Sequence, residues 1–383
     1  MTLDSRFRSR RFEAAWPRQI IKTELDRLIE ACEAPSFHVT NWGDECELFL
    51  LEAFTSSEPL DEFRSIQEHA RSGFIDLQDK STSISRRDWI KKLSTGVDAF
   101  PIPTPRLPYW SERRTAPQTP SLTDLPTTAR RFAAVFDKLA STGYFSWAFG
   151  ELCVDDDYEG TLGPNPAKTI HQELGRDGLW PLFGHIKDYS LDDLCDIIEY
   201  LADQVRRPKR RTLHGHAGCG YHYQHSYSAD RGLEIYRWQV NQVLSQSALG
   251  LTLTENGRLE TAASGPIEDL VTTVRAAENV HDADGMELEH ALTQFRARGA
   301  SEMDRRLAVV ALAGILERRR GLIKEQLQSK DGGALFQIAN QFGIRHQDAK
   351  QQKDYDPELY LEWVFYWYVA TINLTNRIVA SQS

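Results

Sequence analysis

The chain has 383 residues, a hydrophobic fraction of 41%, and five cysteines that lie far apart without a CxxC pair. This length supports two or more domains, and the composition argues against a disordered chain, a disulfide framework and a standard zinc finger. The formal net charge of -10 disfavours indiscriminate coating of nucleic acid or anionic membrane, so nucleic-acid binding needs a local basic cluster. We expect a cytoplasmic protein with reduced thiols and no membrane association.

The N-terminal part of the chain is predicted to be helical. Apolar side chains recur at the 3.6-residue helical period from Ile21 to Cys32, and we assign residues 1–100 to an N-terminal helical region without a functional motif. Residues 101–126 hold seven of the sixteen prolines. This density disfavours a helix or a central strand and predicts an extended linker.

Residues 127–265 are predicted to form a middle helical domain with one hairpin. Ser190, followed by Asp193 three residues later, is the N-cap signal of a helix whose apolar stripe runs from Leu191 to Leu201. Further along, leucines alternate up to the dipeptide Asn256-Gly257, which favours a tight hairpin turn. The pattern therefore predicts a small β-hairpin and no large sheet.

From residue 266 onward the apolar pattern is helical, and it predicts a bundle of about five helices over residues 266–383. The last helix is predicted to start at Asp356-Pro357-Glu358, an N-cap followed by proline at the first helical position. Aromatic side chains on all its sides indicate that other helices or a partner subunit surround it. The predicted fold class is mainly α, with a C-terminal helical bundle and one small hairpin.

A polar segment between two predicted C-terminal helices contains Arg345 next to His346. A histidine that titrates near neutral pH can exchange a proton, and a permanently charged arginine beside it can hold a phosphate oxygen. Such a pair suits the cleavage of RNA without a metal. The alternative is that both side chains only cap the preceding helix, where positive charge favours the C-terminal end of the dipole.

The segment Ala339–Asp348, together with the helix Trp363–Ile372, resembles a C-terminal module of bacterial abortive-infection proteins. That module in turn is similar to the HEPN superfamily of helical bundles, many of which are metal-independent ribonucleases that act as dimers. The resemblance implies a HEPN-like bundle over residues 266–383, a homodimer, and Arg345 and His346 as the catalytic pair. These two residues are adjacent, whereas HEPN proteins usually have several residues between the arginine and the histidine.

A compact basic run stands out in the acidic chain and consists of Arg206, Arg207, Lys209, Arg210 and Arg211. Clustered cations can contact several phosphates, and nearby tyrosines can stack on unpaired bases. The run is therefore our candidate RNA-binding segment. The alternative is a solvated charge run.

Directly after this run, five potential metal ligands occur within twelve residues: His214, His216, Cys219, His222 and His225. These residue types suit zinc, but their spacing matches no standard site and the glycines between them predict a flexible loop. The sequence therefore predicts no cofactor and leaves zinc as an alternative. In a third interpretation, Cys219 and Tyr221 pack into the core while the histidines face solvent.

Taken together, these patterns predict a defence-associated protein that cleaves or senses RNA, with enzymatic activity resting on Arg345 and His346. Two rivals stay open, namely a non-catalytic partner-binding or dimerisation scaffold and a zinc-binding protein. No P-loop, GxGxxG, HExxH or GxSxG motif supports nucleotide hydrolysis or dehydrogenase, metalloprotease or serine-hydrolase chemistry.

Overall fold

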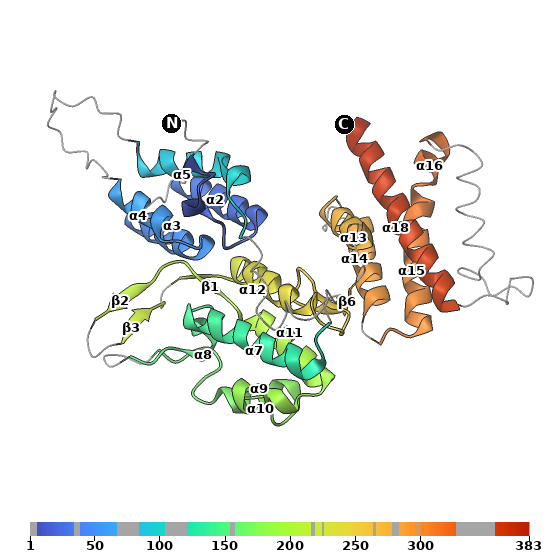
Figure 1. Ribbon diagram of the computed structural model, residues 1–383. Helices are drawn as coiled ribbons and strands as arrows, with labels where there is room; N and C mark the ends of the chain where they lie inside the picture. Colours follow the sequence, from blue (N-terminus) through green and yellow to red (C-terminus); the bar gives the residue numbers. More distant parts are fainter. Residues whose placement is uncertain are drawn as a thin grey trace, which may run out of the picture. The chain divides into compact units, whose positions relative to one another are not determined.

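The computed structural model describes residues 6–33, 39–66, 84–103, 122–153, 158–215, 219–223, 226–262, 266–277, 283–297, 299–326 and 357–382. Helices predominate in these residues and every sheet there has two strands, which confirms the predicted mainly α class (Figure 1). The chain divides into two compact units, Met1–Val240 and Asn241–Ser383. The boundary predicted between residues 265 and 266 therefore falls inside the second unit.

The first unit begins with a group of short helices packed around α2. Its elements are η1 (Arg10–Phe12), α2 (Arg18–Glu33), α3 (Val39–Ala53), α4 (Glu58–Ser65), α5 (Arg86–Thr95) and η2 (Val97–Ala99). Helix α2 packs against both α3 and α5. The centre of this group is aromatic, because the rings of Phe7, Phe12, Phe54 and Phe100 contact one another with centroids 5.1–6.3 Å apart.

The remainder of the first unit is built on further helices. They are α7 (Leu125–Ser141), α8 (Ser146–Phe149), α9 (Pro166–Leu174), α10 (Leu182–His185), η3 (Ile186–Asp188), α11 (Leu191–Gln204) and α12 (Ala229–Leu244). The predicted N-cap of α11 is confirmed, since Ser190 and Asp193 form a reciprocal capping box. Tyr236 of α12 is fully buried, and its hydroxyl donates to the carbonyl of Ile198 on α11 at 2.9 Å. Most of the predicted proline-rich linker, residues 104–121, lies outside the described residues.

Three antiparallel two-stranded sheets occur in the described residues. They pair β1 (Arg207–Pro208) with β4 (Tyr227–Ser228), β2 (Thr212–His214) with β3 (Gly220–His222), and β5 (Leu251–Leu253) with β6 (Leu259–Thr261). The predicted hairpin is the third pair, and Gly257 in its turn has the left-handed φ of +73° that this turn requires. The β2–β3 pair lies at the segment His214–His225 that the sequence predicts as a flexible loop, and the β1–β4 pair flanks it. Strands of two or three residues give no alternating apolar signal, so neither pair was predicted.

A buried ion-pair network joins the two parts of the first unit. Arg207 on β1 is only 4% exposed, and its Nη1 lies 2.6 Å from Oε1 of Glu24 on α2 while its Nε lies 3.1 Å from Oε2 of Glu52 on α3. The guanidinium also lies over the ring of Trp16, 5.2 Å from its centroid. Close approach of α12 to this strand requires Gly232, since a Cβ there would lie 2.6 Å from the Arg207 backbone nitrogen.

The second unit is a helical bundle with its own core. Its helices are α13 (Pro266–Ala277), α14 (Ala283–Arg296), α15 (Glu302–Arg318), α16 (Arg320–Gln326) and α18 (Pro357–Gln382). Helix α15 packs against α14 and α18, and the stacked rings of Phe295 and Phe365, with centroids 3.8 Å apart, join α14 to α18. The predicted start of the last helix matches α18, which begins at Pro357. No helix in the described part of the chain has the length and apolarity needed to cross a membrane.

Candidate metal centre

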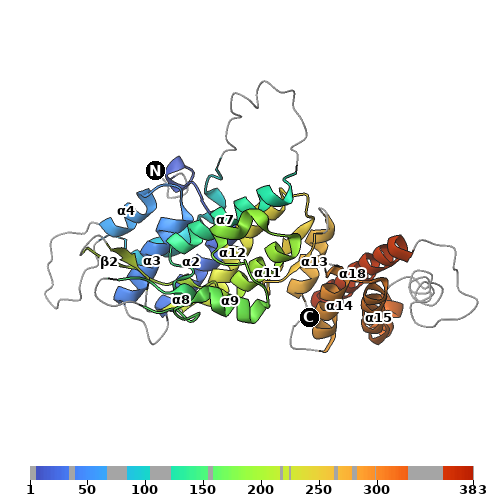
Figure 2. The same cartoon turned by 90° about the horizontal axis from the view of Figure 1, so that it is seen from below.

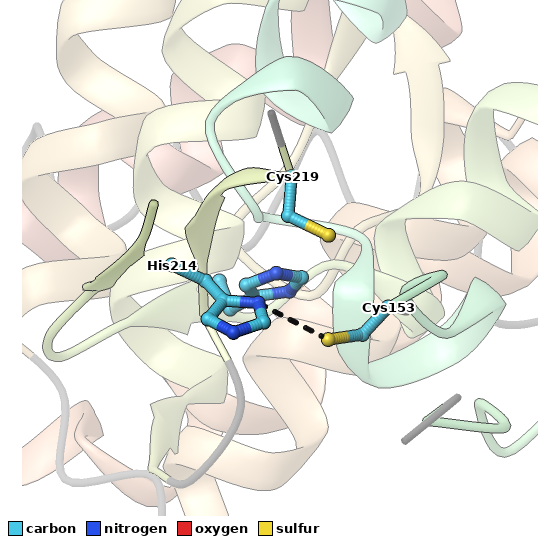
Figure 3. A group of neighbouring side chains, drawn as sticks. Cys153, His214 and Cys219 are labelled. Carbon is cyan, nitrogen blue, oxygen red and sulfur yellow. Dashed lines mark hydrogen bonds between the residues drawn. The ribbon is translucent and has the colours of Figure 1, made fainter. Parts of the chain in front are cut away.

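Four side chains converge at the β2–β3 hairpin of the first unit, namely Cys153, His214, Cys219 and His222. One potential ligand atom from each lies within 4.8 Å of all the others. Figure 3 shows the thiol of Cys153 directed toward the imidazole of His214, with its Sγ 3.4 Å from the His214 Nδ1, and the side chain of Cys219 nearby. All four side chains are partly buried. The cluster is thus a set of two thiols and two imidazoles within reach of a single ion.

The register of the hairpin places both histidines on one face. Thr212 pairs with His222, Leu213 with Tyr221, and His214 with Gly220. Because side chains alternate along a strand and pair across it, the two histidines project to one side while Leu213 and Tyr221 project to the other. The exposures agree, since Leu213 is 62% and Tyr221 45% exposed.

Cys153 reaches the hairpin from a separate arm of the chain. The arm is closed by an antiparallel bridge in which Glu151 and Tyr158 exchange both backbone hydrogen bonds, at 2.9 and 3.0 Å. Gly150 at its base has a φ of +80°, and a Cβ there would lie 2.2 Å from the Tyr158 carbonyl oxygen. Only glycine fits this position, so the tight base of the arm fixes where Cys153 lies.

Glu151 fastens the arm to the hairpin and orients one of the histidines. Its carboxylate accepts the backbone N–H of Tyr223 at 3.0 and 3.1 Å and lies 3.3 Å from the Nδ1 of His222. With Nδ1 donating to the carboxylate, the lone pair of His222 resides on Nε2. That atom is buried and has no hydrogen-bond partner in the described structure. A carboxylate behind a histidine with a free second nitrogen is the usual arrangement around metal-bound histidine.

The geometry of the cluster suits tetrahedral zinc. Zinc binds thiolate at about 2.3 Å and imidazole at about 2.0 Å, so its four ligand atoms lie roughly 3.3–3.8 Å apart. The 3.4 Å separation between Cys153 and His214 already has this value. The longest separation allowed by the cluster, 4.8 Å, needs a contraction of about 1.5 Å or less. Two sulfur and two nitrogen ligands in this geometry favour zinc over harder divalent cations.

The sequence singled out three of the four side chains of this cluster as potential ligands. His214, Cys219 and His222 were candidates and come together, whereas His216 and His225 lie outside the described residues. Cys153 was missed because it lies 61 residues before His214, beyond any local ligand spacing. The interpretation that packs Tyr221 into the core is wrong, because the strand pairing turns its ring outward.

The side chains of the basic run lie in different environments in the structure. Arg207 is buried against Glu24 and Glu52, which corrects its assignment as a phosphate contact because its guanidinium has no access to solvent. Arg206 donates to the carbonyl groups that end α11. Arg210 donates to Asn41 on α3 at 3.0 Å, which places the hairpin beside that helix (Figure 2).

Two cations of the run are partly exposed near the hairpin. The guanidinium of Arg211 lies over the ring of Tyr221, with its carbon 3.8 Å from the ring centroid. The backbone N–H of Lys209 donates to the carbonyl of Ser226, and the Lys209 side chain is partly exposed. Arg211 and Tyr221 thus form a cationic and aromatic pair on the face opposite the metal ligands.

The predicted catalytic pair, Arg345 and His346, lies in residues 327–356, outside the described residues. Comparisons of the chain with family models, with curated proteins and with solved structures found no match.

Proposed function

We propose that this chain is a zinc-binding protein in which Cys153, His214, Cys219 and His222 hold one ion. The observation that carries the proposal is the convergence of four potential ligand atoms, one from each side chain, within 4.8 Å. In addition, the Nε2 of His222 is buried and has no hydrogen-bond partner among the described residues. A buried polar atom without a partner is unfavourable, and a metal ion would supply that partner. Reduced thiols, which the site needs, suit a cytoplasmic location.

The role of the zinc in this proposal is structural. Two thiolates and two imidazoles complete a tetrahedron and leave no open position for water or substrate, which is the arrangement of structural zinc sites. The ion would join the arm at Glu151–Cys153 to the β2–β3 hairpin. Its binding free energy would then contribute to the folding free energy of the first unit.

Metal analysis of the purified protein tests the proposal. We expect one zinc per chain and, after exchange with Co²⁺, the absorption bands of a tetrahedral cobalt site with thiolate ligands. Cys153→Ser and His222→Gln should each lower the zinc content well below one per chain.

Two control variants match these changes outside the cluster. Cys32→Ser alters a thiol on α2 whose Sγ contacts the Ile29 carbonyl, and His171→Gln alters an exposed histidine paired with Asp177. Both controls should keep the full zinc content. A wild-type protein without zinc after growth in zinc-supplemented medium would contradict the proposal, and so would full zinc in both ligand variants.

The second proposal is RNA binding and cleavage. Its support among the described residues is the stacked pair of Arg211 and Tyr221, because an exposed ring with an adjacent cation suits an unpaired base and its phosphate. In this proposal the protein acts in defence, and its C-terminal bundle is HEPN-like and homodimeric. Arg345 and His346 would catalyse the cleavage. His346 would exchange the 2′-hydroxyl proton while Arg345 steadies the charge on the scissile phosphate.

Incubation of the protein with total RNA, with and without EDTA, tests the second proposal. We expect cleavage that EDTA does not abolish and that His346→Ala removes without a change in circular dichroism. Unchanged cleavage by His346→Ala would reject the mechanism. Binding of RNA without cleavage would favour RNA sensing, and a protein that neither binds nor cleaves RNA would favour the scaffold.

A further inference from the structure

The two thiols of the metal centre differ from the other cysteines of the chain in their exposure. Cys153 and Cys219 are both partly exposed. The other three cysteines are buried, namely Cys32, Cys46 and Cys195. Burial also raises the pKa of the Cys32 and Cys46 thiols, which keeps them protonated at neutral pH. Since the thiolate is the reactive form of cysteine, an oxidant in solution should react first at the two thiols of the metal centre.

These two thiols also lie close enough together to form a disulfide bond. Their sulfurs are at most 4.8 Å apart, against about 2.05 Å in a disulfide. A change of rotamer at one cysteine moves its sulfur by about 3 Å, which covers the difference. Figure 3 shows Cys153 and Cys219 on separate segments of the chain, so a bond between them would join the arm to the hairpin.

The backbone beside Cys219 has room for this movement. Gly220 follows Cys219 directly, and a Cβ at that glycine would meet no atom of the described residues within 4 Å. The arm that carries Cys153 is held more tightly, because Gly150 at its base packs directly against the Tyr158 carbonyl group. We therefore expect the Cys219 sulfur to move toward Cys153 when the bond forms.

We propose that the metal centre is also a site of reversible oxidation, at which a peroxide joins Cys153 to Cys219 in a disulfide and the zinc is released. Release of the ion rests on the zinc-binding proposal above, whereas the disulfide rests only on the exposure and separation of the two thiols. The disulfide removes two of the four ligands. His214 and His222 would remain, and two imidazoles hold zinc far more weakly than the complete set.

The oxidation needs only hydrogen peroxide and protons from water. One thiolate attacks a peroxide oxygen and the O–O bond breaks, which gives a sulfenic acid and hydroxide. The second thiolate attacks the sulfenic sulfur, so the S–S bond forms, the S–O bond breaks and a second hydroxide leaves. Two protons convert the hydroxides to water. Each sulfur has then lost one electron, and the peroxide has been reduced to two water molecules.

Oxidation of the zinc-loaded full chain with hydrogen peroxide tests the inference. Trypsin should leave Cys153 on the peptide 139–168 and Cys219 on the peptide 212–231, each with a single cysteine. Mass spectrometry should show these two peptides joined, while a colorimetric indicator detects the release of one zinc per chain. Dithiothreitol should then separate the peptides, and added zinc should bind again at one per chain.

Two variants define the roles of the thiols. Cys219→Ser removes the second thiolate, so the sulfenic acid at Cys153 should persist and be trapped by dimedone instead of forming a disulfide. Cys195→Ser alters a buried thiol on α11 and should leave both the joined peptides and the zinc release unchanged. The wild-type measurement decides the question even if Cys219→Ser fails to fold.

The outcomes distinguish a failed inference from a failed zinc proposal. A zinc-loaded protein that peroxide oxidises without joining the two peptides would overturn the inference and leave the zinc site in place. Zinc that stays bound after the disulfide has formed would overturn it as well, and so would a disulfide between Cys32 and Cys46 in its place. Joined peptides from a protein that never contained zinc would refute the zinc site and the release, but would support the disulfide.

Discussion

Replacement of Arg207 by methionine should destabilise the first unit far more than any other substitution in the basic run. Methionine keeps the length of the side chain but removes the charge between Glu24 and Glu52. Glu24 would retain Arg27, whose Nη2 lies 2.8 Å from its Oε1. Among the residues that the structure describes, Glu52 would retain only the hydroxyl of Tyr144, at 3.0 Å. The variant therefore leaves one buried carboxylate, that of Glu52, without a cation.

The size of the destabilisation follows from this buried, uncompensated charge. Removal of one partner of a buried ion pair typically costs about 3–5 kcal/mol. For a unit of this size, each kcal/mol lowers the melting temperature by roughly 2–4 °C, so we expect a loss of roughly 6–20 °C. Arg206→Met is the matched control, because that neighbouring guanidinium only donates to two backbone carbonyl groups at the end of α11. It should cost about 1 kcal/mol or less.

The stability of the two proteins should depend differently on pH. Burial raises the pKa of Glu24, but Arg207 and Arg27 outweigh this effect, so the pKa is below its usual value. Wild type should therefore lose stability as acid protonates Glu24. Burial keeps the pKa of Glu52 above its usual value even beside Arg207. Without Arg207 that pKa should rise further, so the defect of the variant should shrink as the pH falls and Glu52 becomes neutral.

Urea unfolding followed by circular dichroism at pH 7, pH 5 and pH 3 measures these effects, because the lowered pKa of Glu24 keeps its carboxyl ionised at pH 5. Adding Glu52→Gln to Arg207→Met should recover part of the lost free energy of unfolding, because an amide carries no charge to bury. A difference of less than about 1 kcal/mol between Arg207→Met and Arg206→Met would refute the reasoning, since it would mean that the ion pair carries no stability. Failure of the double variant to recover stability would refute the assignment of the cost to Glu52.

Three further predictions concern other parts of the structure. A zinc chelator should lower the melting temperature of wild type in calorimetry but leave that of Cys153→Ser unchanged, and equal shifts in both proteins would contradict the proposed ligand set. Gly143→Ala should lower the free energy of unfolding, measured in urea, by at least about 2 kcal/mol. The reason is that the φ of Gly143 is +82° and a Cβ there would lie 2.2 Å from the Tyr223 ring. Asn241→Ala should cost about 1–3 kcal/mol, because its amide bonds both backbone groups of buried Leu253, and an unchanged midpoint would show that water replaces both bonds.

The sequence predicted elements whose signals are local. The capping box at Ser190, the start of the last helix at Pro357 and the turn at Gly257 are set by residues within a few positions of one another, and the structure contains all three. The helical spacing of apolar residues likewise predicted the neighbouring helices. Such features depend on short-range hydrogen bonds and backbone sterics, and the residues that form them can be recognised in the sequence without knowledge of the tertiary fold.

The features that escaped prediction depend on partners distant in sequence. Arg207 looks like its neighbours in the basic run, and only the positions of Glu24 and Glu52, more than 150 residues earlier, make it a buried structural residue. Cys153 looks like an isolated thiol until the fold brings it to the hairpin. The ligand spacing of His214, Cys219 and His222 is incomplete without it, so the sequence could suggest zinc but could not define the site.

The distance along the chain between Cys153 and His214 has a consequence for folding. Helices α9, α10 and α11 lie between them, so Cys153 would reach the hairpin when those helices pack. Before that, the hairpin would offer only its own three ligands, and a three-ligand site binds zinc more weakly than a complete one. Tight binding of the ion would therefore occur late in folding. The bound ion would cross-link about 60 residues of chain, and if it acts as a disulfide does, the lost entropy of the unfolded chain would stabilise the fold by roughly 4 kcal/mol. Zinc binding would thus indicate that this part of the chain has folded.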